Sequence, residues 1–266
     1  MVTSTIYHFF GLSRSGNHPI LNWIIQNSGQ AFLFHNDVYA PNMSRILVPS
    51  ELRHDDDQDI SMILSYEDRP LDALHLLPTY AGRDEIVPNA VHRTILLLRD
   101  PFNTFASRKK YLDQRGKLTF HGVSWNETKE LWRVYAQEYM RETRYFDDNL
   151  ILINYNQWFL DKRYRDNWLY AVFGQTQNHD IGIERVSLVG EGSSYDGTAF
   201  EGRANEMDTL GRWQSYIHDP DFLGLFDNDT LRLSLEVFGG VFDVEFVLKE
   251  IQSEKDRSGI SPESKY

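Results

Sequence analysis

Short apolar runs of strand length alternate with longer amphipathic segments along most of the chain. Segments with helical periodicity follow the first, fourth and fifth of these runs. Such alternation is typical of βαβ units, because two parallel strands must be joined by a crossover connection. The pattern therefore predicts an α/β fold with a mostly parallel central sheet flanked by helices. The predicted strands are Thr5–Phe10, Ala31–Phe34, Ser61–Tyr66, Thr94–Leu98 and Asn149–Asn154.

Three further segments show a helical pattern. Trp125–Phe146 keeps its apolar residues near one face, and Asp208–Ile217 and Thr230–Glu250 are also predicted to be helical. No Pro- or Ser-rich linker divides the chain, so we expect one domain over residues 1–252. The charged end, 253–266, contains Ser and Pro and is predicted to be a flexible tail.

Composition narrows the classes of function. With 41% hydrophobic and 14% aromatic residues the chain can build a full core, but its net charge of −12 argues against a broad nucleic-acid surface. Cysteine is absent, which excludes disulfides, thiol nucleophiles and zinc–cysteine sites. No apolar stretch is long enough to cross a bilayer, and the N-terminus carries no basic leader region. We expect a soluble, cytoplasmic enzyme. The acidic run Asp55–Asp57 is expected to be a solvated loop.

A glycine-bounded loop, Gly11–His18, stands between the first predicted strand and a helical segment. This arrangement directs backbone N–H groups and a helix N-terminus at a phosphate. A nucleoside-triphosphatase loop would carry Lys and then Ser or Thr after its second glycine, whereas this chain has Asn17 and His18 there. The basic side chain lies inside the loop instead, at Arg14. The loop therefore predicts an anion site that does not follow the Mg²⁺-dependent pattern.

A second motif follows the strand predicted at Thr94–Leu98. Arg99-Asp100-Pro101 stands at its end, and Ser107 lies eight residues beyond Arg99. Pro101 suits the first turn of a helix, so Arg99 is expected at the strand tip and Ser107 nearly two helical turns away. Both side chains can then reach one phosphate.

Together the two motifs resemble those of sulfotransferases that use 3′-phosphoadenosine-5′-phosphosulfate (PAPS). The resemblance implies a P-loop-like three-layer sandwich. It also implies that Arg14-Ser15-Gly16 belongs to the loop that binds the 5′-phosphosulfate. The family usually continues with two threonines, and Asn17-His18 in their place resembles a divergent, largely microbial branch.

The same resemblance implies roles for residues further along the chain. Arg99 and Ser107 would bind the 3′-phosphate, and Tyr155 would lie near the adenine. The two residues after Tyr155 are Asn and Gln, where the family has an acidic pair, and Pro19 stands where many members stack a Trp on the adenine. A closing segment that covers the nucleotide is implied by the glycine- and serine-rich stretch near residue 195 and by Leu210–Trp213. Its implied cofactor-binding residues are Ser193, Ser194 and Arg203.

The implied reaction is an in-line transfer of the sulfuryl group without a metal ion, and it leaves adenosine 3′,5′-bisphosphate (PAP). Arg14 would stabilise the leaving oxygen, and a general base would take the proton of the acceptor. We prefer Glu67 as this base because it stands at a strand tip, and His75, in an apolar stretch, is the second candidate. His18 and His35 stay open, and His18 could also contact the sulfuryl group.

Two other classes of function remain open at this point. One is a nucleotide kinase on a degenerate loop, and the other is a binding module that keeps the nucleotide cleft without catalysis. The acceptor pocket is expected from the variable segments Tyr39–Asp59, Tyr111–Ser124 and the stretch near Tyr195, whose aromatic and charged residues fit sugars, phenols or lipid-linked alcohols alike. We expect no nucleic-acid partner and no membrane span.

Overall fold

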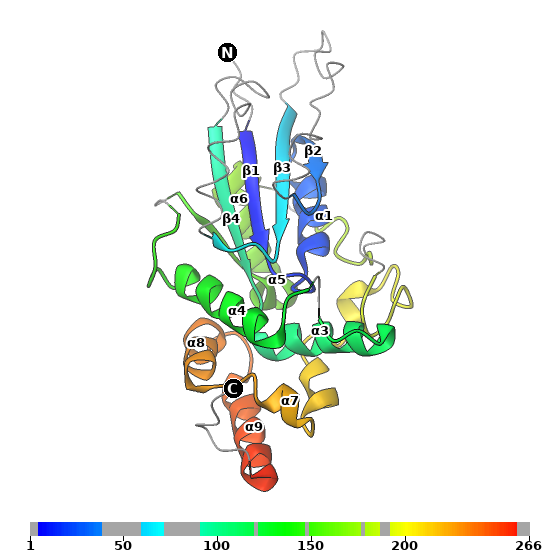
Figure 1. Ribbon diagram of the computed structural model, residues 1–266. Coiled ribbons are helices and arrows are strands. Elements are labelled where there is room, and N and C mark those ends of the chain that lie inside the picture. The colour runs from blue at the N-terminus through cyan, green and yellow to red at the C-terminus, as the bar shows by residue number, and fades with distance from the viewer. Residues whose placement is uncertain are drawn as a thin grey trace.

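The computed structural model describes residues 5–38, 60–71, 91–119, 122–146, 149–176, 179–186 and 192–259. Its centre is a five-stranded parallel sheet with the strand order β2-β3-β1-β4-β5 (Figure 1). All five predicted strands are present, so the prediction of a parallel α/β fold is confirmed. The strands are β1 (Thr5–Gly11), β2 (Ala31–His35), β3 (Ile60–Glu67), β4 (Val91–Leu98) and β5 (Ile151–Asn154).

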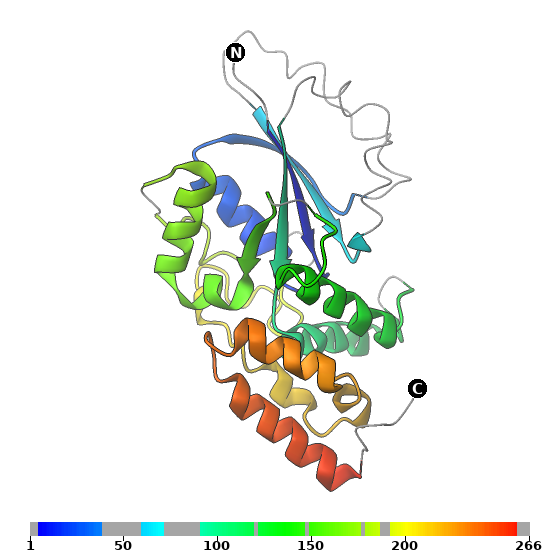
Figure 2. The ribbon, with the colours of Figure 1, turned by 90° about the vertical axis from the view of Figure 1, so that its left-hand side faces the viewer.

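Helices cover both faces of the sheet and make a three-layer sandwich. Figure 2 shows α1 and α6 on one side of the sheet and α4 on the other, with α8 and α9 beyond the sheet's lower end. Two short 3₁₀ helices lie between α6 and α7, at Ala204–Glu206 and Arg212–Tyr216. The α-helices are α1 (Asn17–Asn27), α3 (Pro101–Arg115), α4 (Trp125–Tyr139), α5 (Tyr155–Leu160), α6 (Lys162–Phe173), α7 (Pro220–Leu223), α8 (Asn228–Phe238) and α9 (Val244–Ser258).

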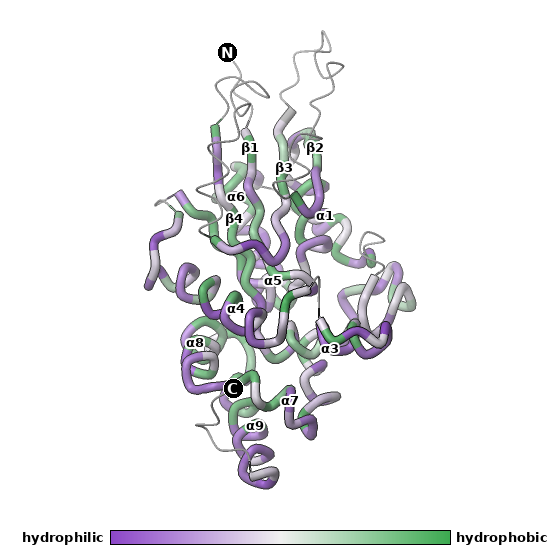
Figure 3. The backbone as a smooth tube through the Cα atoms, in the orientation of Figure 1, coloured by the Kyte–Doolittle hydropathy of each residue, from purple (hydrophilic) through white to green (hydrophobic). Residues whose placement is uncertain are grey.

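Two hydrophobic clusters hold the layers together, one on each face of the sheet. Alternate residues of β1 point to opposite faces, so Phe10 joins the cluster beneath α3 and α4, while Phe9 joins the cluster beneath α1, α5 and α6. The carboxyl half of β4 is buried throughout, and Figure 3 shows it as hydrophobic, while α9 alternates in hydropathy. A strand covered on both faces has this continuous apolar pattern.

The longer helix predictions need correction. The helix expected over Trp125–Phe146 ends at Tyr139, because the chain turns there and Arg141 adopts a left-handed conformation with φ 62°. The segment Thr230–Glu250 forms two helices, α8 and α9, instead of one. Gly239 and Gly240 separate them, and a side chain on Gly239 would come within 2.6 Å of a carbonyl of α8. Of Asp208–Ile217, the structure makes only the 3₁₀ turn at Arg212–Tyr216 helical.

The C-terminal tail starts later than predicted. Helix α9 continues through Ser258, so the expected flexible tail from residue 253 is wrong over 253–258, and 260–266 lie outside the described residues. Lys255 explains the difference, because its side chain is buried and its ammonium donates to the carbonyl of Phe226. That contact anchors the last turns of α9 to the body of the fold.

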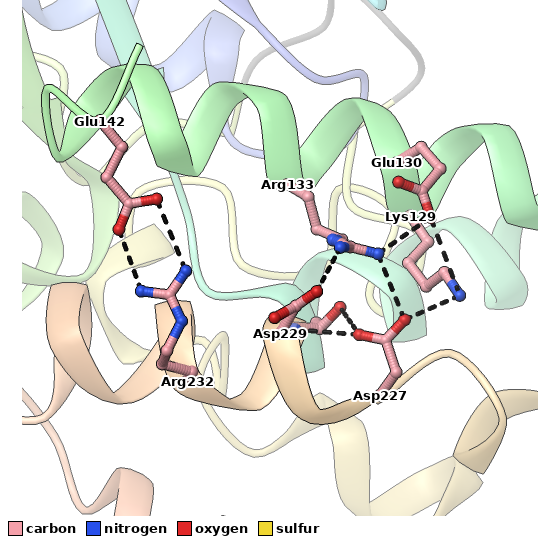
Figure 4. A network of polar contacts seen from close by, with 8 residues as sticks. Lys129, Glu130, Arg133, Glu142, Asp227, Asp229 and Arg232 are labelled. Atoms are coloured by element: carbon pink, nitrogen blue, oxygen red, sulfur yellow. Dashed lines mark hydrogen bonds and ion pairs between the residues drawn. The ribbon is translucent and has the colours of Figure 1, made fainter. Parts of the chain in front are cut away.

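Helices α4 and α8 are also joined by charged side chains, which we call the α4–α8 ion-pair network (Figure 4). Arg133 pairs with Asp229 at 2.6 Å and with Asp227 at 3.4 Å, and Arg232 pairs with Glu142 at 2.9 Å. Lys129 adds a second contact to Asp227, at 3.0 Å. No helix in the described part of the chain is long and apolar enough to cross a membrane.

Candidate functional site

A cavity of about 380 Å³ lies at the carboxyl ends of the central strands, where parallel α/β sheets bind ligands. Its wall is built from the loop after β1 with the start of α1, the residues after β2, the tips of β3 and β4, helices α3 and α5, residues 183–186 and the segment 192–212, which we call the closing segment. Four arginines line it: Arg185 is exposed, whereas Arg14, Arg99 and Arg212 are partly or fully buried.

The loop after β1 has the shape expected of an anion cradle. Arg14 (φ 69°) and Gly16 (φ 99°) both adopt left-handed conformations, and the Ser15 amide closes the turn onto the carbonyl of Leu12 at 3.1 Å. Gly16 has no room for a side chain, because a Cβ there would come within 2.2 Å of the Tyr155 ring. Helix α1 begins directly afterwards, with no acidic residue in its first turn. Its positive end therefore faces the cavity.

A buried ion pair supports this loop from behind. Asp68 accepts the amide of Ser13 at 3.0 Å and the guanidinium of Arg108 at 2.6 Å. Burial alone would raise the pKa of Asp68, but the Arg108 charge and the Ser13 N–H outweigh it and hold that pKa below its usual range. Arg108 thus positions the loop and does not line the cavity.

Arg14 connects the loop to the closing segment. Its Nη2 donates to the carbonyl of Gly192 at 3.0 Å and to the hydroxyl of Ser194, and its guanidinium lies 5.2 Å from the centre of the Tyr111 ring. Burial lowers the pKa of Arg14 from its ordinary value. Because burial is costly for a cation, this position favours a negatively charged ligand.

Arg99 stands at the tip of β4, as predicted, and is only 2% exposed. It donates to the carbonyl of Arg14 at 3.2 Å and to the carbonyl of Thr209, and it lies 4.6 Å from the centre of the Tyr155 ring. Its Nε has no hydrogen-bond partner among the described residues. Helix α3 starts two residues later, where Pro101 follows the N-cap Asp100 as expected.

Arg212 is the functional residue that sequence reasoning missed. Its two terminal nitrogens donate to the hydroxyls of Ser107 and Ser193, each at 2.9 Å, while its Nε lacks a partner within the described chain. Burial, reinforced by the charge of Arg99, lowers the pKa of Arg212 to about 10. The available signal was a basic residue in Leu210–Trp213, a stretch already assigned to the closing segment.

The structure does not bring Arg203 to the cavity. Its side chain is 59% exposed and pairs with Glu206 at 3.3 Å on the surface. Arg212 takes the place in the closing segment that the sequence suggested for Arg203. The 3₁₀ turn beginning at Arg212 packs on α3, and this packing brings the guanidinium beside Ser107.

The other predicted cofactor residues fall into two groups. Gly16, Asn17, His18, Tyr155 and Ser193 line the cavity. Ser15, Ser107 and Ser194 support it from behind: the Ser15 hydroxyl donates to the Leu12 carbonyl at 2.6 Å, and the other two hydroxyls accept hydrogen bonds from cavity arginines.

Two of the candidate bases stand on the cavity wall. Glu67, at the tip of β3, accepts the hydroxyl of Ser13 at 2.9 Å, and the Nε2 of His18 lies 3.7 Å from its other oxygen. His35 does not line the cavity, and burial lowers its pKa. His75 and the acidic run Asp55–Asp57 lie outside the described residues.

The arrangement is suited to an anion with more than one charged group. The charge of Arg99 lowers the pKa of both Arg14 and Arg212, although the carboxylate of Glu67 acts on Arg14 in the opposite direction. Asp196 lies 3.7 Å from Arg212, and the carboxylates of Glu67 and Asp37 line the same cavity. An anion in the cavity would relieve the repulsion between Arg99 and Arg212. The described residues contain no cluster of three or more side chains able to hold a metal ion.

No protein-family model matches the sequence, and no curated protein matches it significantly. A function for this chain therefore has to come from the chemistry of the cavity.

Proposed function

We propose that this chain is a sulfotransferase that moves a sulfuryl group from PAPS to a hydroxyl or amine acceptor. One observation carries the proposal: the guanidinium groups of Arg14, Arg99 and Arg212 converge on one cavity at the carboxyl ends of the strands. PAPS places a phosphosulfate at one end of its ribose and a phosphate at the other, so it needs two cationic sites.

The cavity offers a place for each part of that molecule. The phosphosulfate fits the loop after β1, where Arg14 and the N-terminus of α1 supply positive charge. The 3′-phosphate fits Arg99 and Arg212, which line the cavity side by side with the Tyr155 ring. The adenine fits the ring face of Tyr155 and the apolar wall formed by α5, because a planar base stacks on aromatic side chains.

The proposed step balances as one bond formed and one broken. The acceptor oxygen bonds to sulfur while the bond from sulfur to the bridging phosphate oxygen breaks, and that electron pair stays on the phosphate of PAP. Arg14 stabilises this oxygen, and Glu67 takes the proton of the acceptor. Ser13 holds the Glu67 carboxylate from one side, which leaves its other oxygen toward His18 and the cavity.

Binding tests the proposal first. Isothermal titration calorimetry should show that PAP binds and that ATP with Mg²⁺ binds far more weakly. Removing a hydrogen bond to a charged group costs about 1.5 to 3 kcal/mol, so Arg212→Ala should weaken PAP binding about 10- to 100-fold. Tighter binding of ATP with Mg²⁺ than of PAP would favour the alternative that the chain is a nucleotide kinase.

Catalysis is tested with ³⁵S-labelled PAPS and a panel of acceptors. Glu67→Gln keeps the shape of the side chain but cannot accept the proton, so turnover should fall about 10²- to 10⁴-fold while PAP affinity stays unchanged. Unchanged turnover would remove Glu67 as the base and direct attention to His18. PAP binding without transfer to any acceptor would favour the non-catalytic binding module.

A further inference from the structure

One side of the cavity differs in chemistry from its arginines. His18 in α1, Asn36 and Asp37 after β2, and Glu67 at the tip of β3 form what we call the polar wall. β2 and β3 are neighbouring parallel strands, so their carboxyl ends bring these residues together. The side chains of His18 and Glu67 are 18% and 16% exposed, so they are reachable from the cavity yet held in place.

The polar wall is a connected unit. The Nε2 of His18 lies 3.0 Å from Oδ1 of Asn36 and 3.7 Å from Oε1 of Glu67. Ser13 donates to the second oxygen of Glu67 at 2.9 Å. A site built from mutually oriented side chains is preorganised for a ligand, which lowers the entropy lost on binding.

The segment after β2 is held as firmly. Asp37 adopts a left-handed conformation, with φ 47°, and its carboxylate pairs with Arg69 at 2.9 Å. The next amide, that of Val38, donates to the carbonyl of Ser65 in β3 at 2.8 Å, and the hydroxyl of Tyr135 donates to the carbonyl of Arg69 at 2.7 Å. These contacts fix the carboxylate of Asp37 at the rim of the cavity.

The polar wall presents acceptor oxygens that favour a ligand with hydrogen-bond donors. A carboxylate only accepts hydrogen bonds and offers about four lone-pair positions. In the described contacts of Glu67, the Ser13 hydroxyl donates to Oε2, whereas His18 stands beyond hydrogen-bond distance from Oε1. A ligand with several O–H or N–H groups can donate to Oε1 of Glu67 and to the other oxygens of the polar wall.

Charge and shape point the same way. The carboxylate of Glu67 disfavours an anion beside it, whereas the charge of Asp37 is paired with Arg69. The phenyl, phenol and indole rings of the cavity come from α3 and α5, as Tyr111, Tyr155, Trp158 and Phe159. The polar wall contributes only the imidazole of His18, so a flat aromatic acceptor finds little stacking surface there.

We propose that the polar wall is the acceptor subsite and that the acceptor is a neutral polyhydroxylated molecule of carbohydrate type. One hydroxyl would face Glu67 and the sulfuryl position, and neighbouring hydroxyls would donate to Asp37 and Oδ1 of Asn36. This inference rests on the proposed function, because it presumes that the nucleotide fills the arginine side of the cavity.

Saturation-transfer NMR on the full chain loaded with PAP tests the inference. Methyl α-D-glucopyranoside, 4-nitrophenol and glucuronate serve as probes at millimolar concentration. We expect saturation of the neutral sugar and little of the other two. Asn36→Leu removes one hydrogen-bond acceptor and should weaken sugar binding about two- to tenfold. The control is Asn228→Leu, which replaces an exposed asparagine of α8 and should leave sugar binding unchanged.

The outcomes separate the two proposals. Failure of PAP to bind in calorimetry overturns the proposed function and the inference with it. If PAP binds, saturation of 4-nitrophenol or glucuronate in preference to the sugar overturns the inference alone, and so does saturation of none of the probes. Sugar binding that is equally strong in Asn36→Leu also overturns the inference alone. In a second readout, labelled PAPS should transfer sulfate to the neutral sugar faster than to 4-nitrophenol.

Discussion

Arginines occur in two different settings in this protein, at the cavity and in the α4–α8 ion-pair network. In the network, Arg133 and Arg232 lie against carboxylates at distances down to 2.6 Å, so the charge of each arginine is compensated (Figure 4). At the cavity, Arg99 and Arg212 are nearly buried, each has an unpartnered Nε in the described structure, and each repels the other. Balanced charge is what a structural contact needs, whereas unbalanced buried charge points to a ligand of the opposite sign.

A third setting sharpens the comparison. Arg108 is as buried as Arg99, but it faces the carboxylate of Asp68 at 2.6 Å. Burial alone therefore does not mark a binding residue. Arg99 lines the cavity and forms no salt bridge in the described structure, and these two features separate it from Arg108. The predictions below test this distinction, beginning with the largest expected effect.

Arg108→Ala should destabilise the fold strongly. The substitution leaves the buried Asp68 carboxylate without its cation, which typically costs about 3 to 5 kcal/mol in the free energy of unfolding. Urea denaturation followed by circular dichroism measures this change. The double variant Arg108→Ala/Asp68→Ala is the matched control and should be less destabilised than the sum of its two single substitutions. A loss of stability in the double variant equal to the sum of the two single losses would show that Arg108 and Asp68 are not coupled.

Acid should weaken the same pair. The pKa of Asp68 is lower in the folded protein than in the unfolded chain, so the unfolded chain binds a proton first as the pH falls. The stability from this group is therefore complete above the ordinary Asp pKa of about 4 and is lost as the pH falls through the folded value.

The free energy of unfolding, measured between about pH 5 and about pH 2, should drop more steeply in the natural protein than in Asp68→Asn. Asp100, whose pKa is raised by burial, contributes with the opposite sign in both proteins and cancels in the comparison. Parallel curves would contradict a depressed pKa for Asp68.

Arg99→Ala should act on binding more than on folding. It removes a cation that faces the proposed 3′-phosphate, so PAP affinity in calorimetry should fall about 10- to 100-fold. The substitution also relieves repulsion with Arg212, so it should cost less stability than Arg108→Ala. Arg232→Ala, from the α4–α8 network, is the control and should leave PAP affinity unchanged. Equal PAP affinity in Arg99→Ala and Arg232→Ala would contradict the distinction between the cavity arginines and those of the α4–α8 network.

Arg133→Ala should give the smallest effect. Pairs between partly exposed charges contribute about 0.2 to 1 kcal/mol each, and salt screens them. Chemical denaturation of the natural protein and the variant should therefore show a small difference at low salt that shrinks in high salt. A difference that persists in high salt would mean that Arg133 stabilises α8 by packing and not by charge.

Much of the local structure could be predicted because its causes are local. The apolar runs placed the five strands, and Asp100-Pro101 marked the start of α3. Predictions that depended on where a long helix stops were less accurate. Gly239 and Gly240 separate α8 from α9, and the chain turns after Tyr139, so neither periodic segment continued as predicted.

The sequence by itself determined the parallel α/β class, because hydrophobic period depends on neighbouring residues, and it predicts anion binding by two short motifs. Only the tertiary structure decided which charges meet. Arg212 joins Arg99 across 113 positions of the chain, Arg108 finds Asp68, and Arg203 stays on the surface. Electrostatic energy depends on distance in space and on burial, and a linear pattern contains neither.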